Sequence, residues 1–167
     1  VCSLPGVFSH GELDKGTKLL LEKHTSGMSG NVLDFACGAG VIASYLMLTY
    51  PHLKMQLSDI SALAIYASAM TLAANGQSAT LHAANGLYGI EGKVQHIVTN
   101  PPFHTGLKTD YTITKRFIED ASKMLSQNGS LQMVANRFLP YPGLLSEHFP
   151  RVLTTAQTTQ FSLYQAA

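Results

Sequence analysis

One stretch decides the fold of this chain: Val32-Leu33-Asp34-Phe35-Ala36-Cys37-Gly38-Ala39-Gly40. Its first half is a short apolar run, which predicts a buried strand over residues 31–36. Its second half consists of small residues, which predict a turn whose backbone a ligand can approach, followed by a helix with unpaired N–H groups at its start. This order is typical of an α/β sheet that binds a ligand beyond the carboxyl ends of its strands.

The rest of the chain repeats the alternation of strand and helix. Apolar runs predict further strands at about 54–59, 79–84, 94–99, 131–135, 151–155 and 159–164. Helical patterns lie before the first strand at 12–24 and between later strands at 41–49, 61–74 and 111–126. A short helix follows Pro140. The last two strands have no room for a helix between them, so one must run antiparallel. The sequence therefore predicts a Rossmann-like α/β fold with a seven-stranded, mostly parallel sheet, one antiparallel strand near the C-terminus and helices on both faces.

Start and stop signals fix several helix ends. Ser61 is expected to cap the helix at 61–74, and Asn75-Gly76 to end it. In the same way, Asn128-Gly129 is expected to end the helix at 111–126. The core-facing stripe of that helix is expected to be Ile113, Phe117, Ala121 and Leu125. The core-facing stripe of the helix at 12–24 is expected to be Leu13, Thr17, Leu20, Leu21 and His24.

Composition limits the classes of protein that fit. At 167 residues the chain suits a single domain with a real core, and its net charge of +1 gives no argument for nucleic acid. Cys2 and Cys37 are too few for a disulfide framework and favour a cytoplasmic location. The histidines show no metal-ligand spacing, so no metal site is expected. No apolar run reaches the ~20 residues of a membrane span.

The charged fraction is unusually small. Only 13% of the residues are charged, against about 25% in a typical domain, so we expect part of the surface to pack against another domain. The chain also begins at Val1 rather than at a methionine. We therefore expect residues 1–167 to be one domain cut from a longer protein.

Two carboxylates lie at the carboxyl ends of the first two predicted strands. Asp34 would repel a pyrophosphate and suits a cationic ligand instead. Ala43 stands where the dinucleotide-binding pattern G-x-G-x-x-G has its third glycine, which also argues against a nicotinamide dehydrogenase. Asp59 ends the second strand, where a carboxylate can accept hydrogen bonds from both hydroxyls of a ribose. The alternative for Asp59 is a cap of the following helix.

A third motif, Asn100-Pro101-Pro102-Phe103, follows the strand at 94–99. The two prolines fix the backbone and remove two N–H donors, which leaves carbonyl groups as acceptors. The carboxamide oxygen of Asn100 and an adjacent carbonyl can then hold the two N–H groups of a planar amine. Phe103 offers a flat face on which a base can stack. Alone, the motif would be a proline-rich turn; with the first two motifs it predicts an amine-binding site.

Together the three motifs resemble class I S-adenosylmethionine-dependent methyltransferases that modify exocyclic or amide nitrogens. The flanking stretches 5–9, 13–16, 72–76 and 135–142 resemble more closely the C-terminal catalytic half of the bacterial 16S ribosomal RNA guanine-N2 methyltransferases. The resemblance covers nearly the whole chain. It implies S-adenosyl-L-methionine as cofactor, ribosomal RNA, within the small subunit, as partner, and an additional N-terminal domain. Ala36 departs from the family pattern, which has glycine there.

The resemblance also implies a role for each position. Asp34, Cys37, Gly38 and Gly40 would surround the amino-acid end of the cofactor, Asp59 its ribose, and Ile60 and Asn85 its adenine. The complete cofactor-binding set is Asp34, Ala36, Cys37, Gly38, Gly40, Asp59, Ile60, Asn85 and Asn100. The catalytic set is Asn100, Pro101, Pro102 and Phe103, and the substrate-binding set is Phe8, Ser9, Phe103 and His104. For Phe8 an ordinary core contact is an equal alternative, and for Cys37 and His104 packing beside the site is favoured over catalysis.

Some residues near the motifs have two interpretations. Asp14 is a candidate helper of the reaction, or else a helix cap or a surface charge. Four basic residues could meet phosphates of RNA, or else form a solvated helix face. They are Lys108, Lys115, Arg116 and Lys123.

Three other functions remain open. A protein glutamine-N5 methyltransferase and an adenine-N6 methyltransferase need the same hydrogen-bond acceptors for a planar amine. Phe103 and the flanking sequence favour a nucleobase over a protein amide as the substrate. A non-catalytic RNA-binding module would arise as the degenerate half of a duplicated fold. Such a half would be expected to lose Asp59 or the run 100–103, and both are present.

Overall fold

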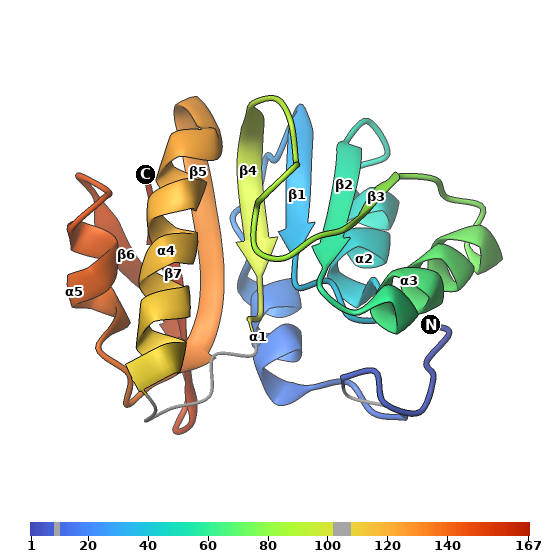
Figure 1. Ribbon diagram of the computed structural model, residues 1–167, viewed down its shortest axis with the longest axis horizontal. Helices are drawn as coiled ribbons and strands as arrows, with labels where there is room; N and C mark the ends of the chain where they lie inside the picture. The colour runs from blue at the N-terminus through green and yellow to red at the C-terminus, as the bar shows by residue number, and fades with distance from the viewer. Residues whose placement is uncertain (9–10, 102–107) are drawn as a thin grey trace.

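The computed structural model describes residues 1–8, 11–101 and 108–167, with side chains from residue 112 onward in the last segment. It contains a seven-stranded sheet in the order β3-β2-β1-β4-β5-β7-β6 (Figure 1). The strands are β1 (Asn31–Phe35), β2 (Lys54–Asp59), β3 (Thr80–Ala83), β4 (Val94–Thr99), β5 (Leu125–Asn136), β6 (Val152–Gln157) and β7 (Phe161–Ala166). The helices are α1 (Lys15–Lys23), α2 (Val41–Thr49), α3 (Ala62–Ala74), α4 (Lys108–Met124) and α5 (Tyr141–Ser146).

The directions of the strands match the prediction. β1 pairs in parallel with β2 and β4, β2 with β3, and β4 with β5. β7 lies between β5 and β6 and is antiparallel to both. The predicted mostly parallel sheet with one antiparallel strand near the C-terminus is therefore confirmed. No helix within the described ranges is long and apolar enough to cross a membrane.

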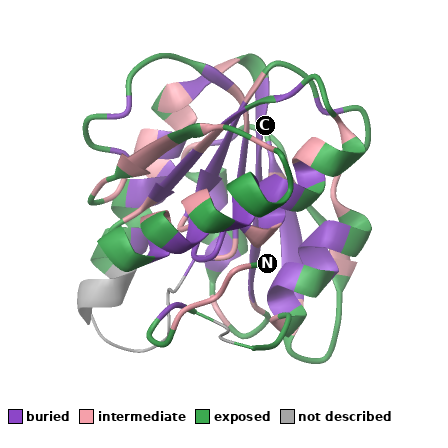
Figure 2. Ribbon diagram, turned by 90° about the vertical axis from the view of Figure 1, so that its right-hand side faces the viewer, coloured by how far each residue is buried: buried purple, intermediate pink, exposed green. Residues whose placement is uncertain are grey.

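Each face of the sheet buries its own core. Val32 of β1 belongs to a cluster that includes residues of α1, α2 and α3, whereas Leu33 and Phe35 belong to a cluster with α4 and α5. On the second face the rings of Phe35 and Phe117 stack with centroids 4.2 Å apart. Figure 2 shows the buried strands between helices whose outer surfaces are exposed. Strands covered on both faces read as apolar runs, which is why the sequence revealed them.

The helix ends differ in how well the sequence predicted them. α3 begins after Ser61, whose side chain accepts a hydrogen bond from the backbone N–H of Ala64, and it ends before Asn75-Gly76, as expected. α1 begins only at Lys15, because the side chain of Asp14 caps it. Leu13 consequently lies outside the helix and is exposed rather than core-facing.

Two expectations about α4 and its end are wrong. Ile113 is 52% exposed, whereas Phe117, Ala121 and Leu125 are buried as predicted. Asn128-Gly129 does not end the helix, because α4 stops at Met124 and β5 starts at Leu125. Asn128 adopts the expected left-handed conformation, with φ of 65°, but inside the strand. The pairing of β4 with β5 shifts register over this stretch.

The strand order places the motifs together. β1, β2 and β4 are neighbours, and their carboxyl ends meet at the lower edge of the sheet in Figure 1. The chain leaves these ends at Ala36, Ile60 and Asn100. Loops that follow neighbouring parallel strands lie side by side, so residues more than sixty positions apart in the sequence share one site.

Candidate active site

A cavity of about 1260 Å³ lies at this edge of the sheet. The loops after β1, β2, β3 and β4 and the inner face of α4 form its wall. Eight of the predicted site residues line it: Phe8, Ala36, Gly38, Asp59, Ile60, Asn85, Asn100 and Pro101. A smaller cavity of about 270 Å³ adjoins it along the start of α1 and shares Asp14 and Asn100 with it.

The turn after β1 depends on left-handed backbone conformations. Gly38 and Gly40 have φ of 54° and 73°. A Cβ atom added at Gly40 would lie 3.2 Å from the Cα of Ser68 in α3, so a side chain there would be both crowded and strained. At Gly38 the nearest atom to an added Cβ is 4.0 Å away, which leaves open space beside the turn. Ala36 is also left-handed, with φ of 56°, at the position where the resemblance led us to expect glycine.

Asp59 joins the turn to the second strand. One of its carboxylate oxygens accepts a hydrogen bond from the backbone N–H of Gly38 at 3.0 Å, and the other accepts one from Ser61 at 2.9 Å. An ionised carboxylate can accept about four hydrogen bonds, so capacity for further donors remains. Asp59 thus supports the start of α3, where Ser61 is the cap, and still faces the cavity. The cap of α3 is Ser61, so the alternative of Asp59 as that cap is wrong, and the ribose role of Asp59 stays a prediction.

Asp34 lies beneath the turn rather than in the described wall of the cavity. It is fully buried, and its Oδ2 accepts a hydrogen bond from the backbone N–H of Ala43 at 3.0 Å. Its Oδ1 has no partner. Desolvation raises the pKa of Asp34 to about 8; the hydrogen bond from Ala43 opposes this shift, and the charge of Asp59 adds to it. Asp34 therefore ties α2 to β1 below the site.

Asn100 is held by two residues of the N-terminal segment. Its side-chain amide nitrogen donates to Oδ2 of Asp14 at 2.7 Å and to Oγ1 of Thr17 at 2.9 Å. Pro101 follows it in the cavity wall and is buried. Asp14 was a candidate on sequence grounds, but Thr17 was assigned to the core stripe of the first helix. Their separation by three residues was the available signal, since it places both at the first turn of one helix.

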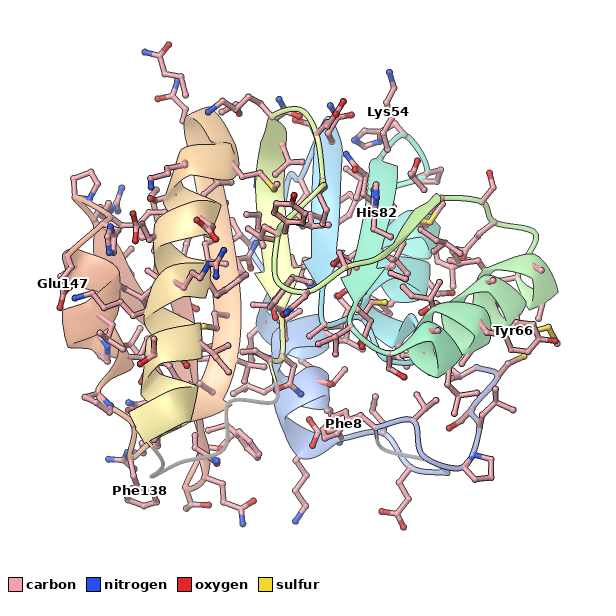
Figure 3. All side chains as sticks on the ribbon, viewed as in Figure 1. Phe8, Lys54, Tyr66, His82, Phe138 and Glu147 are labelled. Atoms are coloured by element: carbon pink, nitrogen blue, oxygen red, sulfur yellow. The ribbon has the colours of Figure 1, made fainter. Side chains whose placement is uncertain are left out.

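The remaining predicted residues are placed as follows. Phe8, which is labelled in Figure 3, is 51% exposed and lines both cavities. The alternative that Phe8 makes an ordinary core contact is therefore wrong. Cys37 is buried and lines only the smaller cavity. Burial raises the pKa of its thiol, and the nearby charge of Asp34 adds to the shift, which fits packing rather than nucleophilic chemistry. Ser9, Pro102, Phe103 and His104 lie outside the described residues.

The described basic residues of α4 pair with acidic neighbours. Lys115 Nζ lies 2.8 Å from Glu147 Oε2. The ion pairs of Arg116 with Asp120 and of Lys123 with Glu119 span 3.7 Å and 2.6 Å. Lys115 lies on the solvated side of the helix, whereas Arg116 and Lys123 also line the main cavity, so a contact of these two with RNA phosphates stays a prediction. The side chain of Lys108 lies outside the described set.

Sequence reasoning missed part of the cavity wall. Five of the missed residues are Ala64, Leu87, Phe117, Asn136 and Phe161. Leu87 lies in the connection from β3 to β4, for which no regular element was expected, and Phe161 comes from the far end of the chain. Only the three-dimensional arrangement brings them to the site.

The comparison with known protein families decides the family. The model of the methyltransferase small domain matches residues 1–165. The chain belongs to this family. A ribosomal RNA small subunit methyltransferase C of Alteromonas mediterranea is 72% identical over 99% of this methyltransferase domain, which covers 46% of that protein. The protein of the same name from Pseudoalteromonas atlantica is 50% identical over 98% of the chain and 48% of its own length.

A solved structure is also similar. The 16S rRNA N2 methyltransferase of T. thermophilus, in complex with AdoMet and guanosine, superposes with a TM-score of 0.85 and 28% identity. The superposition covers 98% of the methyltransferase domain and 46% of that protein. The chain therefore spans about half the length of each of these relatives.

Proposed function

We propose that this chain binds S-adenosyl-L-methionine and positions the exocyclic N2 of a guanine in 16S ribosomal RNA to receive the methyl group. The observation that carries the proposal is the position of Asn100-Pro101 in the wall of the same cavity as Asp59 and Ala36. The group proposed to bind the amine and the carboxylate proposed to bind the ribose thus line one cavity. The names of the similar proteins support the ribosomal RNA target and favour it over a protein amide.

The residues present fit the cofactor. The open space beside Gly38 gives a ligand access to the backbone of the turn. Asp59 keeps acceptor capacity for ribose hydroxyls, and Asn85 lines the wall farther along. Ile60 and Leu87 provide apolar surface for a planar base. Ala36 stands where the family pattern has glycine, and its backbone adopts the left-handed conformation that is typical of glycine.

The chemistry asks mainly for positioning. Bound S-adenosylmethionine supplies an electrophilic methyl group on its sulfonium centre. The carboxamide oxygen of Asn100 and the carbonyl of Pro101 accept the two N–H groups of the target amine and orient its lone pair. The same two oxygens stabilise the positive charge that develops on the nitrogen. The amine can release its extra proton to water, so the site needs no dedicated base.

The test is methylation of small ribosomal subunits that lack the modification. The complete native polypeptide is incubated with them and a methyl-labelled donor, and the RNA is digested to nucleosides for chromatography. We expect label in N2-methylguanosine. Asn100→Ala should lower the rate by about 10²–10³, because it removes one oriented dipole from the transition state. Asn75→Ala is the matched control, since among the described residues its carboxamide donates to the carbonyl of Thr71 at the end of α3.

Three results would overturn the proposal. Label in N6-methyladenosine or in a protein glutamine would change the substrate. RNA binding without methyl transfer would indicate the non-catalytic module instead. A normal rate for Asn100→Ala would remove Asn100 from the mechanism.

We also propose that a second, N-terminal domain and the ribosomal RNA are partners of this domain in the cytoplasm. The similar proteins are about twice as long as the matched region, which leaves room for another domain. The charged fraction of 13% supports an additional packed surface.

A further inference from the structure

We propose that Asp14 and Thr17 are positioning residues for Asn100: they hold its amide NH2 group so that its carboxamide oxygen faces the cavity. The inference rests on the proposed function, because it concerns the group that would receive the target amine. The hydrogen bonds from Asn100 to Asp14 and Thr17 would select one of the two possible orientations of the Asn100 carboxamide.

The contacts use both hydrogens of the amide. The Asn100 nitrogen lies 2.7 Å from Oδ2 of Asp14 and 2.9 Å from Oγ1 of Thr17. An amide nitrogen has two hydrogens to donate, so these contacts satisfy it completely. No described residue donates to the Asn100 oxygen. Asn100 lines both cavities, so a carboxamide oxygen turned away from Asp14 and Thr17 can face them.

The chemistry of Asp14 makes this orientation the preferred one. An ionised carboxylate only accepts hydrogen bonds, so the group of Asn100 that faces it has to be the NH2 group. The flipped orientation would place the carboxamide oxygen against the carboxylate and turn two donors toward the target amine. Two donors cannot bind an amine through its hydrogens. Asp14 thus excludes the unproductive orientation electrostatically.

The two positioning residues are themselves fixed. Oδ2 of Asp14 also accepts the backbone N–H of Thr17 at 2.7 Å, as the cap of α1. Thr17 is buried. A Cβ atom added at Gly16 would lie 3.1 Å from the same Asp14 oxygen and 3.3 Å from the ring of Phe161. The first turn of α1 is therefore packed closely where it meets Asn100.

Asp14 also brings a charge to the site. Its carboxylate lies 2.7 Å from the Asn100 amide nitrogen, so it polarises this amide and favours positive charge on the far side of the amide. The electrostatic stabilisation by Asp14 grows as the target nitrogen becomes positive. It should therefore affect the rate of methyl transfer more than the binding of the substrate.

Two substitutions separate the positioning role from the helix cap. Asp14→Ser keeps a capping hydroxyl for the N–H of Thr17 but removes the charge and shortens the side chain that reaches Asn100. Thr17→Val keeps the shape and removes the second acceptor, and Thr17→Ser restores it. Thr49→Val in α2 is the matched control, because its hydroxyl contacts only the carbonyl of Tyr45 among described partners.

Steady-state methylation by the complete native polypeptide is the first measurement. We expect Asp14→Ser to lower kcat about tenfold to a hundredfold, with KM and the Kd for S-adenosylmethionine within about twofold of wild type. Thr17→Val should lower kcat less, Thr17→Ser should recover it, and Thr49→Val should leave it unchanged. In an Asn100→Ala background, Asp14→Ser should have little further effect, because the group through which it acts is gone.

The second measurement needs neither cofactor nor activity. In amide-proton NMR spectra, the Asn100 side-chain NH2 should exchange at least about tenfold faster with solvent in Asp14→Ser than in wild type, because a protecting acceptor is lost. An unchanged kcat, or equal losses with and without Asn100, would overturn the positioning role while leaving the proposed function intact. Unchanged exchange would overturn the hydrogen bond itself.

An inactive wild type would instead count against the proposed function, and the exchange result would still decide the orientation of Asn100.

Discussion

Two residues of the turn region occupy environments that disfavour them. Ala36 has a left-handed backbone, with φ of 56°, which costs a residue with a Cβ atom about 1–2 kcal/mol. Asp34 is a fully buried carboxyl group with one unpartnered oxygen. Both lie at or directly beneath the wall of the main cavity, where such costs are typical of functional sites. Each cost can be measured by substitution.

Ala36→Gly should raise the free energy of unfolding by about 0.5–1 kcal/mol, because glycine adopts this conformation without steric strain but loses more entropy on folding. Urea denaturation measures the change. Ala39→Gly is the matched control: Ala39 is buried in the same turn and has no positive φ, so the substitution should be destabilising. Loss of stability in Ala36→Gly would contradict the strain argument.

Asp34 should make stability fall as pH rises. Burial raises its pKa from 3.8 to about 8, so between these values the folded state holds a proton that the unfolded state has lost. The contribution of Asp34 is complete below pH 4 and is lost as pH rises to about 8, with a slope of at most about 1.4 kcal/mol per pH unit. Asp34→Asn should remove this slope. Denaturation of both proteins at pH 5, 7 and 9 is the measurement, and parallel pH profiles would contradict the assignment.

At the scale of elements, the turn after β1 is fixed by the packing of α2 against α3. Gly40 is the N-cap of α2, and the backbone of Ser68 in α3 lies directly against it. The hydroxyl of Ser68 donates to the carbonyl of Gly38 at 2.9 Å, so α3 also holds the turn itself. The shape of the proposed cofactor site therefore depends on a helix contact that the glycine pattern alone does not reveal.

Gly40→Ala should lower stability by about 1–3 kcal/mol, because the new Cβ would lie 3.2 Å from the Cα of Ser68 and φ is +73°. Thermal unfolding and denaturant titration give the change. Gly143→Ala in α5 is the matched control, since an added Cβ there meets nothing within 4 Å and its φ is not positive. That substitution should be neutral or stabilising by up to about 1 kcal/mol. Equal effects of both would contradict the packing argument.

At the scale of the whole molecule, the sequence predicted the sheet better than the site. Apolar runs and short connections determine strand number and direction, so β1, β2 and β4 were found within a residue of their ends. The turn-forming residues Asn128-Gly129 predicted the end of a helix at that point. The sequence did not show that pairing with β4 extends β5 back to Leu125. Likewise, motif spacing identified Asn100 and Asp59 but not Thr17 or Phe161. Contacts between distant elements bring Phe161 to the main cavity, and bring Thr17 to Asn100 and the smaller cavity.

We expect the main cavity to hold S-adenosylmethionine with Asp59 at its ribose. Calorimetric titration of this chain with S-adenosylmethionine, wild type beside Asp59→Ala, tests it most directly. We predict saturable one-to-one binding that weakens tenfold or more in the variant, because charge-assisted hydrogen bonds of a carboxylate are each worth about 1.5–3 kcal/mol. Circular dichroism of the variant serves as the control for folding. Absence of saturable binding to the wild type, or equal affinity in a folded Asp59→Ala variant, would contradict the account.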